Sequence, residues 1–308
     1  MLLVIQILSA LIFWSGCKGS TDESPSSQPQ ARAAGGLNSK NRLGERHLRF
    51  GRYQPALKAF RAALVNAEDS VRAYVGLSHA HLELGELPQA AATLDLANAL
   101  DPSRAEVFYA RSLICLRLYA TTHQGALLDQ GLAAARQAVL LNPDQKAYFY
   151  VLGSLYSYRD DLHATHAGDL DSAEVAYRRA LQLDPGLAAA YGRLGSIYKY
   201  QGRFAAAEKA YRQQLELQPQ NTRARSDLAI LCRNDGRLAE ARLLLEEAVR
   251  MDTGLTVAYL NLGQLYMQAG KTEAGQQALK RFRELSARDL QQKDREVRER
   301  TKKRGESE

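Results

Sequence analysis

The chain has 308 residues, of which 45% are hydrophobic and eight are proline, and its 41 Lys and Arg against 34 Asp and Glu give a formal net charge of +7. No segment alternates Val, Ile or Thr with polar residues as a half-buried strand does, so the composition favours an all-helical fold. Basic and acidic residues are interleaved and no nucleic-acid-binding motif is present, which argues against a nucleic-acid partner. We expect the basic excess to serve an acidic protein surface or anionic lipid headgroups.

An uncharged apolar run, MLLVIQILSALIFW, occupies residues 1–14 and is followed by SGC, which ends at Cys17. The run is shorter than the ~20 residues that a membrane-spanning helix needs. Small residues directly before a cysteine resemble the lipobox of bacterial lipoprotein signal peptides. This resemblance implies a signal peptide over 1–16, cleavage after Gly16 and lipidation of Cys17. Trp14 stands where a lipobox usually has Leu, and no Lys or Arg precedes the run, so an ordinary cleaved signal or a short uncleaved anchor stays open.

Residues 17–36 are polar and rich in Ser, Pro, Gln and Gly, with no pattern that could form a core. This composition is typical of a flexible tether between an anchor and a folded domain. We therefore expect a protein of the bacterial cell envelope that is lipid-anchored, faces the periplasm, and lies at the outer membrane in preference to the inner.

A pattern of small and large apolar residues recurs with a spacing of 34 residues. Leu194, Gly202, Ala207 and Tyr211 return as Leu228, Gly236, Ala241 and Leu245, and again as Leu262, Gly270, Gly275 and Leu279. Upstream copies begin at Leu43 and Leu77. The period and the signature resemble the tetratricopeptide repeat. The resemblance implies a right-handed α-solenoid of about seven helix-turn-helix repeats, over 37–70, 71–104, 105–145, 146–187, 188–221, 222–255 and 256–289.

The copies at 105–145 and 146–187 run to 41 and 42 residues, an excess of about two helical turns over the period. Either their helices are lengthened or a longer loop joins them. Residues 290–308 are highly charged. We expect this segment to begin as a capping helix and to fray from Lys302 onward.

No enzyme signature is present: the sequence has no Gly-x-Ser-x-Gly elbow, phosphate-binding glycine loop, Cys-x-x-Cys pair or His-Glu-x-x-His motif. We expect no catalysis, no cofactor and no small-molecule substrate. His163 and His166 stand three apart among aspartates and form a weak metal candidate. Cys115 and Cys232 take first-helix core positions and imply no redox chemistry.

The resemblance places first-helix positions on the concave face of each repeat, where the family binds its partners. Tyrosine and arginine are enriched at interface hot spots, although a groove tyrosine can also merely shield neighbouring helices. The candidate groove residues are Tyr109, Leu113, Arg117, Tyr150, Ser154, Tyr158, Arg193, Ser196, Lys199, Tyr200, Arg233 and Asn261. The dicarboxylate clamp of chaperone-binding members is absent, because Asn41 and Glu45 stand where it needs Lys and Asn.

Two functions fit these features. One is a non-catalytic, envelope-anchored scaffold that binds a segment of another envelope protein in its groove, as pilotins and outer-membrane assembly components do. The other is an accessory regulator or recruiter of an enzyme of peptidoglycan or polysaccharide synthesis.

Overall fold

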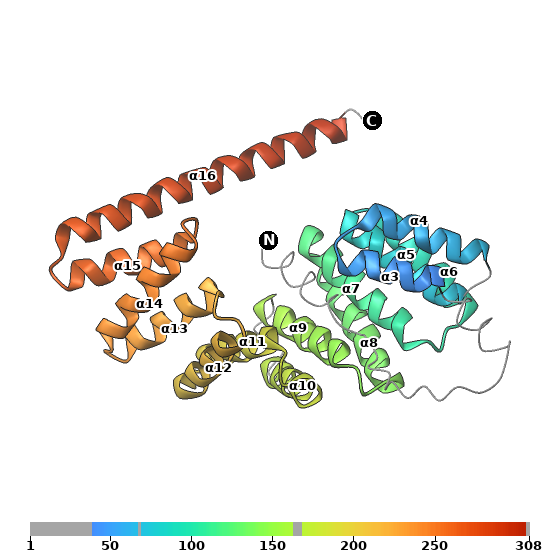
Figure 1. Ribbon diagram of the computed structural model, residues 1–308, viewed down its shortest axis with the longest axis horizontal. Helices are drawn as coiled ribbons and strands as arrows, with labels where there is room; N and C mark the ends of the chain where they lie inside the picture. Colours follow the sequence, from blue (N-terminus) through green and yellow to red (C-terminus); the bar gives the residue numbers. More distant parts are fainter. Residues whose placement is uncertain (1–38, 67–68, 163–167, 306–308) are drawn as a thin grey trace, which may run out of the picture. The chain divides into compact units, whose positions relative to one another are not determined.

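The computed structural model describes residues 39–66, 69–162 and 168–305. Within these ranges the chain forms fourteen α-helices and no strand, which confirms the all-helical fold (Figure 1). The predicted signal peptide, Cys17 and the tether lie outside the described residues, as do His163 and His166.

Consecutive helices form hairpins, and each of the seven segments interpreted as a repeat contains one hairpin. The pairs are α3 (Ser39–Arg49) with α4 (Tyr53–Val65), α5 (Ser70–Leu84) with α6 (Leu87–Leu100), α7 (Ala105–Thr122) with α8 (Gly125–Leu141), α9 (Lys146–Leu162) with α10 (Asp169–Leu183), α11 (Ala188–Tyr200) with α12 (Phe204–Leu217), α13 (Thr222–Asn234) with α14 (Leu238–Met251), and α15 (Thr256–Gln268) with α16 (Thr272–Gly305).

The chain divides into two compact units, residues 1–190 and 191–308. In the first unit, each described helix packs against the next along the chain, and the first helices of successive hairpins also contact each other. The second unit repeats this arrangement, with α13 against α15. Each hairpin thus buries its apolar surface against its neighbours, as in a solenoid.

Close approach of the two helices explains the small residues of the repeat. A Cβ added to Gly195 would lie 2.6 Å from Cε1 of Tyr211, and one added to Gly44 would lie 2.6 Å from Cε1 of Phe60. Tyr211 and Phe60 are buried, at 1% and 0% exposure. The first helix therefore needs glycine where the aromatic ring of the second helix packs against its backbone.

The turn between the helices is closed in the same way in most hairpins. Gly202 ends α11 with φ 74°, and the N–H of Arg203 then donates to the Tyr198 carbonyl at 2.8 Å. A positive φ is a conformation that glycine adopts without steric cost. The third repeat differs, because His123 takes this position with φ 55°.

The excess residues of the third repeat lengthen its helices. The helices α7 and α8 have 18 and 17 residues, whereas α11, α13 and α15 have 13 each, and the connection between α7 and α8 stays short. In the fourth repeat α9 has 17 residues, and residues 163–167 lie outside the described ranges. The loop alternative is therefore wrong for the third repeat and untested for the fourth.

The last helix does not stop where the repeat period ends. α16 continues without a break from Thr272 to Gly305, a length of 34 residues (Figure 1). The charged segment after residue 289 thus extends the second helix of the seventh repeat instead of forming a separate cap, and the helix includes Lys302.

Candidate partner-binding face

The predicted groove residues all lie on first helices. Tyr109, Leu113 and Arg117 lie on α7, and Tyr150, Ser154 and Tyr158 lie on α9, all in the first unit. Arg193, Ser196, Lys199 and Tyr200 on α11, Arg233 on α13 and Asn261 on α15 belong to the second unit.

Four of these residues are buried, contrary to the prediction that they contact a partner. Leu113, Tyr150 and Ser154 are 2%, 1% and 1% exposed, and Asn261 is 7% exposed. The Tyr150 ring packs edge-on against Tyr177 at 5.3 Å between centroids. Ser154 donates to the Tyr150 carbonyl at 3.0 Å and accepts from the Tyr177 hydroxyl at 3.1 Å. These side chains therefore join α9 to α10, and Tyr150 is a core residue.

The first unit carries a row of aromatic rings on α5, α7 and α9. Tyr109 packs against Tyr148 with centroids 4.8 Å apart, and His79 meets Tyr109 edge-on at 6.1 Å. Further along, the rings of Tyr119 and Tyr158 lie 6.1 Å apart. Burial raises the pKa of Tyr109 and lowers that of His79 to about 4. His79 is therefore neutral at physiological pH.

An ion pair connects the first helices α5 and α7. Arg117 Nη2 is 3.7 Å from Glu83 Oε1, and the Tyr53 hydroxyl donates to Glu83 Oε2 at 3.4 Å. The Glu83 side chain is 8% exposed. Burial raises its pKa, while the charge of Arg117 opposes that shift. His79 and Glu83 were not among the predicted groove residues. They stand at the ninth and thirteenth positions of the second repeat, which are positions selected as groove residues in the third, fourth and fifth repeats.

In the second unit, a salt bridge connects two successive first helices. Lys199 Nζ on α11 lies 2.7 Å from Asp227 Oδ1 on α13, and Arg223 Nε lies 3.9 Å from Asp227 Oδ2. Ser196 Oγ and the Tyr211 hydroxyl are 3.2 Å apart. Tyr200, at the end of α11, is 77% exposed.

Arg233 is held by two side-chain amides of the next first helix. Its Nη1 donates to Asn261 Oδ1 and to Gln264 Oε1, each at 2.9 Å. The Asn261 amide donates in turn to the Val257 carbonyl at 2.9 Å. Since Asn261 is buried and anchored on its own helix, it fixes the guanidinium at the face formed by α13 and α15.

Neither of the two cysteines in the described residues is exposed on this face. Cys115 and Cys232 are free thiols and are buried, as their core positions predicted. Burial raises the pKa of the Cys232 thiol to about 11. Because the thiolate is the reactive form, this thiol is a poor nucleophile. Among the residues described, no group of three or more His, Cys, Asp or Glu side chains could hold a metal ion.

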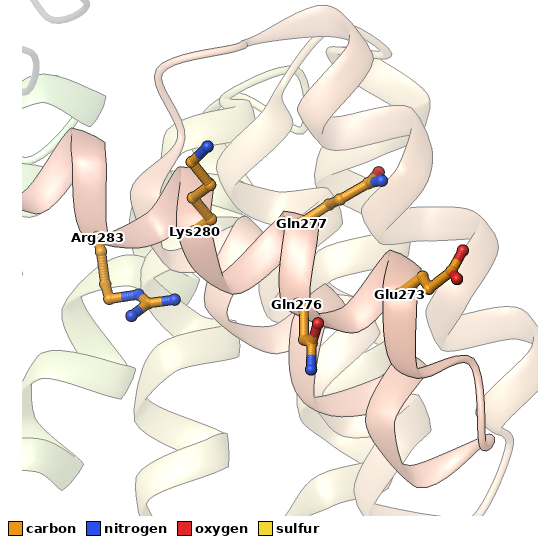
Figure 2. A pocket seen from close by; sticks show the side chains of 5 residues that line it. All are labelled: Glu273, Gln276, Gln277, Lys280 and Arg283. Atoms are coloured by element: carbon orange, nitrogen blue, oxygen red, sulfur yellow. The ribbon is translucent and has the colours of Figure 1, made fainter.

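The outward face of α16 is polar. Figure 2 shows a shallow hollow lined by α16 side chains alone: Glu273, Gln276, Gln277, Lys280 and Arg283. One repeat earlier, Glu246 stands 34 positions before Lys280 and accepts from the Tyr266 hydroxyl of the following hairpin at 2.7 Å. Lys280 takes the corresponding position in α16, the last helix that the structure describes.

None of the helices in the described ranges is both long enough and apolar enough to span a bilayer.

Comparison with models of known protein families identifies the same repeat that the 34-residue period predicts. Two family models, both described as tetratricopeptide repeat, match the chain: one at residues 193–255 and the other at 47–114 and 233–293. Together these matches cover more than half of the chain. A search of curated proteins finds no match.

Several solved structures share the fold. The tetratricopeptide protein TTC0263 of Thermus thermophilus is 24% identical, with 63% of this chain and 98% of that chain covered and a TM-score of 0.52. PilF of Pseudomonas aeruginosa is 17% identical, with 71% and 98% covered and a TM-score of 0.59. A chain of the Cut9–Hcn1 complex of the APC/C is 17% identical, with 74% and 42% covered and a TM-score of 0.61. These identities establish the fold alone, and with the family matches they show that the chain belongs to the tetratricopeptide repeat family.

Proposed function

We propose that this protein is a non-catalytic scaffold that binds a segment of another protein on the face formed by the first helices of its second unit. The observation that carries the proposal is the placement of Arg233. A buried Asn261 and an exposed Gln264 hold its guanidinium in one position on that face. A recognition surface gains from such a pre-positioned arginine.

Exposed aromatic surface supports the same conclusion. Tyr200, at the C-terminal end of the first helix α11, is 77% exposed. Tyrosine and phenylalanine supply large contact areas at low entropic cost, and such residues often anchor interfaces. The proposed face therefore combines aromatic surface with fixed polar groups.

A photocrosslinking experiment distinguishes this face from the outer helices. A benzophenone amino acid at Tyr200, on the first-helix face, should crosslink a partner in living cells. The matched position is Leu243, which is 53% exposed on the second helix α14 of the same unit. We expect a defined adduct from Tyr200 and none from Leu243. Adducts of equal yield, or an adduct from Leu243 alone, would move binding away from the first helices.

The setting that we propose is the bacterial cell envelope, with Cys17 as the lipidated residue. The support is the apolar run followed by SGC and the polar segment after it. Cys17→Ser should leave an unprocessed or soluble species that no longer partitions into detergent. Unchanged partitioning would mean that the apolar run itself is the anchor.

A further inference from the structure

From the charges on the first helices of the second unit, we infer that this face binds an acidic segment of the partner, with a carboxylate on Arg233. The inference rests on the proposed function and specifies the chemistry of the partner. On α11 and α13, three of the cations at this face are Lys199, Arg223 and Arg233, whereas Asp227 carries a carboxylate. The adjoining helix α15, Thr256–Gln268, has no charged residue at all.

The Asp227 carboxylate is already engaged by other cations. Lys199 lies 2.7 Å from one of its oxygens and Arg223 lies 3.9 Å from the other. Arg233 has no carboxylate partner within the described part of the chain, and both of its hydrogen bonds run to neutral amide oxygens. An amide oxygen satisfies an N–H group but leaves the charge of the guanidinium uncompensated. The positive charge at this point is therefore available to a ligand.

The geometry of the guanidinium favours a carboxylate. Both amides are bound to Nη1, so the Nε–H and Nη2–H groups make no hydrogen bond within the described residues. Guanidinium and carboxylate pair through two parallel hydrogen bonds, which makes such contacts directional as well as strong. Asn261 restricts the motion of the side chain before a ligand arrives, which lowers the entropic cost of binding.

A lipid headgroup is a less suitable occupant than a peptide. Recognition of anionic membranes uses clusters of about four to eight Lys or Arg on a surface that a bilayer can approach. Here one guanidinium is fixed by a buried side chain, and the two other cations named on this face both pair with Asp227. This arrangement is suited to one carboxylate of a peptide segment.

The test uses the full-length chain and a fluorescein-labelled ten-residue peptide of Asp, Glu and Leu. The neutral probe is the same peptide with Asn in place of each Asp and Gln in place of each Glu. Gln264→Glu places a carboxylate beside Arg233 at an exposed position, so the arginine stays in place while its charge is neutralised. Gln276→Glu makes the same change on the polar face of α16, away from Arg233. Fluorescence anisotropy should show that the acidic peptide binds the native chain. Gln264→Glu should lower the affinity for this peptide about tenfold, whereas Gln276→Glu should leave it within about twofold of the native value.

Three results would overturn the inference: equal affinity for the neutral peptide, unchanged affinity in Gln264→Glu, or binding to phosphatidylglycerol vesicles without binding to the acidic peptide. Arg233→Lys separates charge from geometry, because it keeps the cation but loses the paired hydrogen bonds, and it should also weaken binding. The Tyr200 crosslinking result is independent of this assay. A partner captured at Tyr200 together with failure of the acidic peptide would leave the scaffold standing and refute only the acidic ligand.

Discussion

Gly195 lies on α11 against the ring of Tyr211, and Gly195→Ala should destabilise the second unit. An added Cβ would lie 2.6, 2.8 and 2.9 Å from three atoms of that ring. The ring cannot move outward easily, because Tyr211 is 1% exposed and its hydroxyl lies 3.2 Å from Ser196 Oγ. Either the ring or the helix must shift to admit the methyl group.

Two opposing terms set the size of the effect. Overpacking of a dense core costs typically about 1–3 kcal/mol, and the contacts under 3 Å place this site near the upper end. Alanine in place of glycine inside a helix recovers roughly 1 kcal/mol. The expected net loss is therefore about 1–2 kcal/mol in the free energy of unfolding. Urea unfolding followed by circular dichroism would register it as a lower midpoint.

A second substitution tests the cause of that loss. The sixth repeat has Ala229 and Leu245 at the positions of Gly195 and Tyr211, and both are buried in one core cluster. In a Tyr211→Leu background, Gly195→Ala should therefore cost nothing or stabilise by up to about 1 kcal/mol. If Gly195→Ala is neutral in the native background, or equally harmful in both backgrounds, the ring contact is not the reason for glycine.

Two further predictions concern burial. Tyr150→Ala should lower the free energy of unfolding by about 3–5 kcal/mol, measured by thermal or urea unfolding, because it removes a ring packed against Tyr177. Tyr200→Ala should change the stability by less than about 0.5 kcal/mol. Similar effects from both substitutions would contradict the burial of Tyr150 and the exposure of Tyr200. Burial lowers the pKa of His79 to about 4, from an ordinary value of 6.5, so the unfolded chain binds a proton at a higher pH than the folded chain does. Stability should then fall as the pH drops from 6.5 to 4, by at most about 3 kcal/mol. His79→Gln should flatten this dependence in urea titrations at pH 7 and pH 4.5, and an unchanged slope would show that other groups cause it.

The period of 34 residues was enough to predict the helical hairpins, because each repeat packs against copies of itself and so reuses the same contacts. Turn glycines such as Gly202 and close-contact glycines such as Gly195 could be identified from their positions alone. The third repeat was harder, since a seven-residue excess fits either longer helices or a longer loop. The lengths of α7 and α8, with His123 ending α7 at a positive φ, show that the helices are longer.

Groove residues were predicted less well, and Tyr150 shows why. A position rule states which way a side chain points from its helix, but exposure depends on what the neighbouring helix places beside it. The second helix of the fourth repeat supplies Tyr177, whose ring and hydroxyl cover Tyr150 and Ser154. At the end of α11 no such ring covers Tyr200, which stays 77% exposed. The fifth position of the fourth repeat thus holds a core tyrosine, whereas the thirteenth position of the fifth repeat holds a surface tyrosine.

Two arginines four residues apart show that the sequence does not reveal which charges are balanced by neighbouring side chains. Arg237 is surrounded by carboxylates, with Asp235 at 2.8 Å, Glu240 at 3.0 Å and Glu208 in a further ion pair. In the part of the chain that the structure describes, Arg233 hydrogen-bonds only to the amides of Asn261 and Gln264. Both residues contribute equally to the formal charge of +7, yet the charge of Arg237 is balanced within the repeat stack and that of Arg233 is not. A carboxylate ligand would therefore compete with three internal carboxylates at Arg237 and, among the described residues, with no carboxylate at Arg233, which is why the affinity for an acidic segment should depend on Arg233.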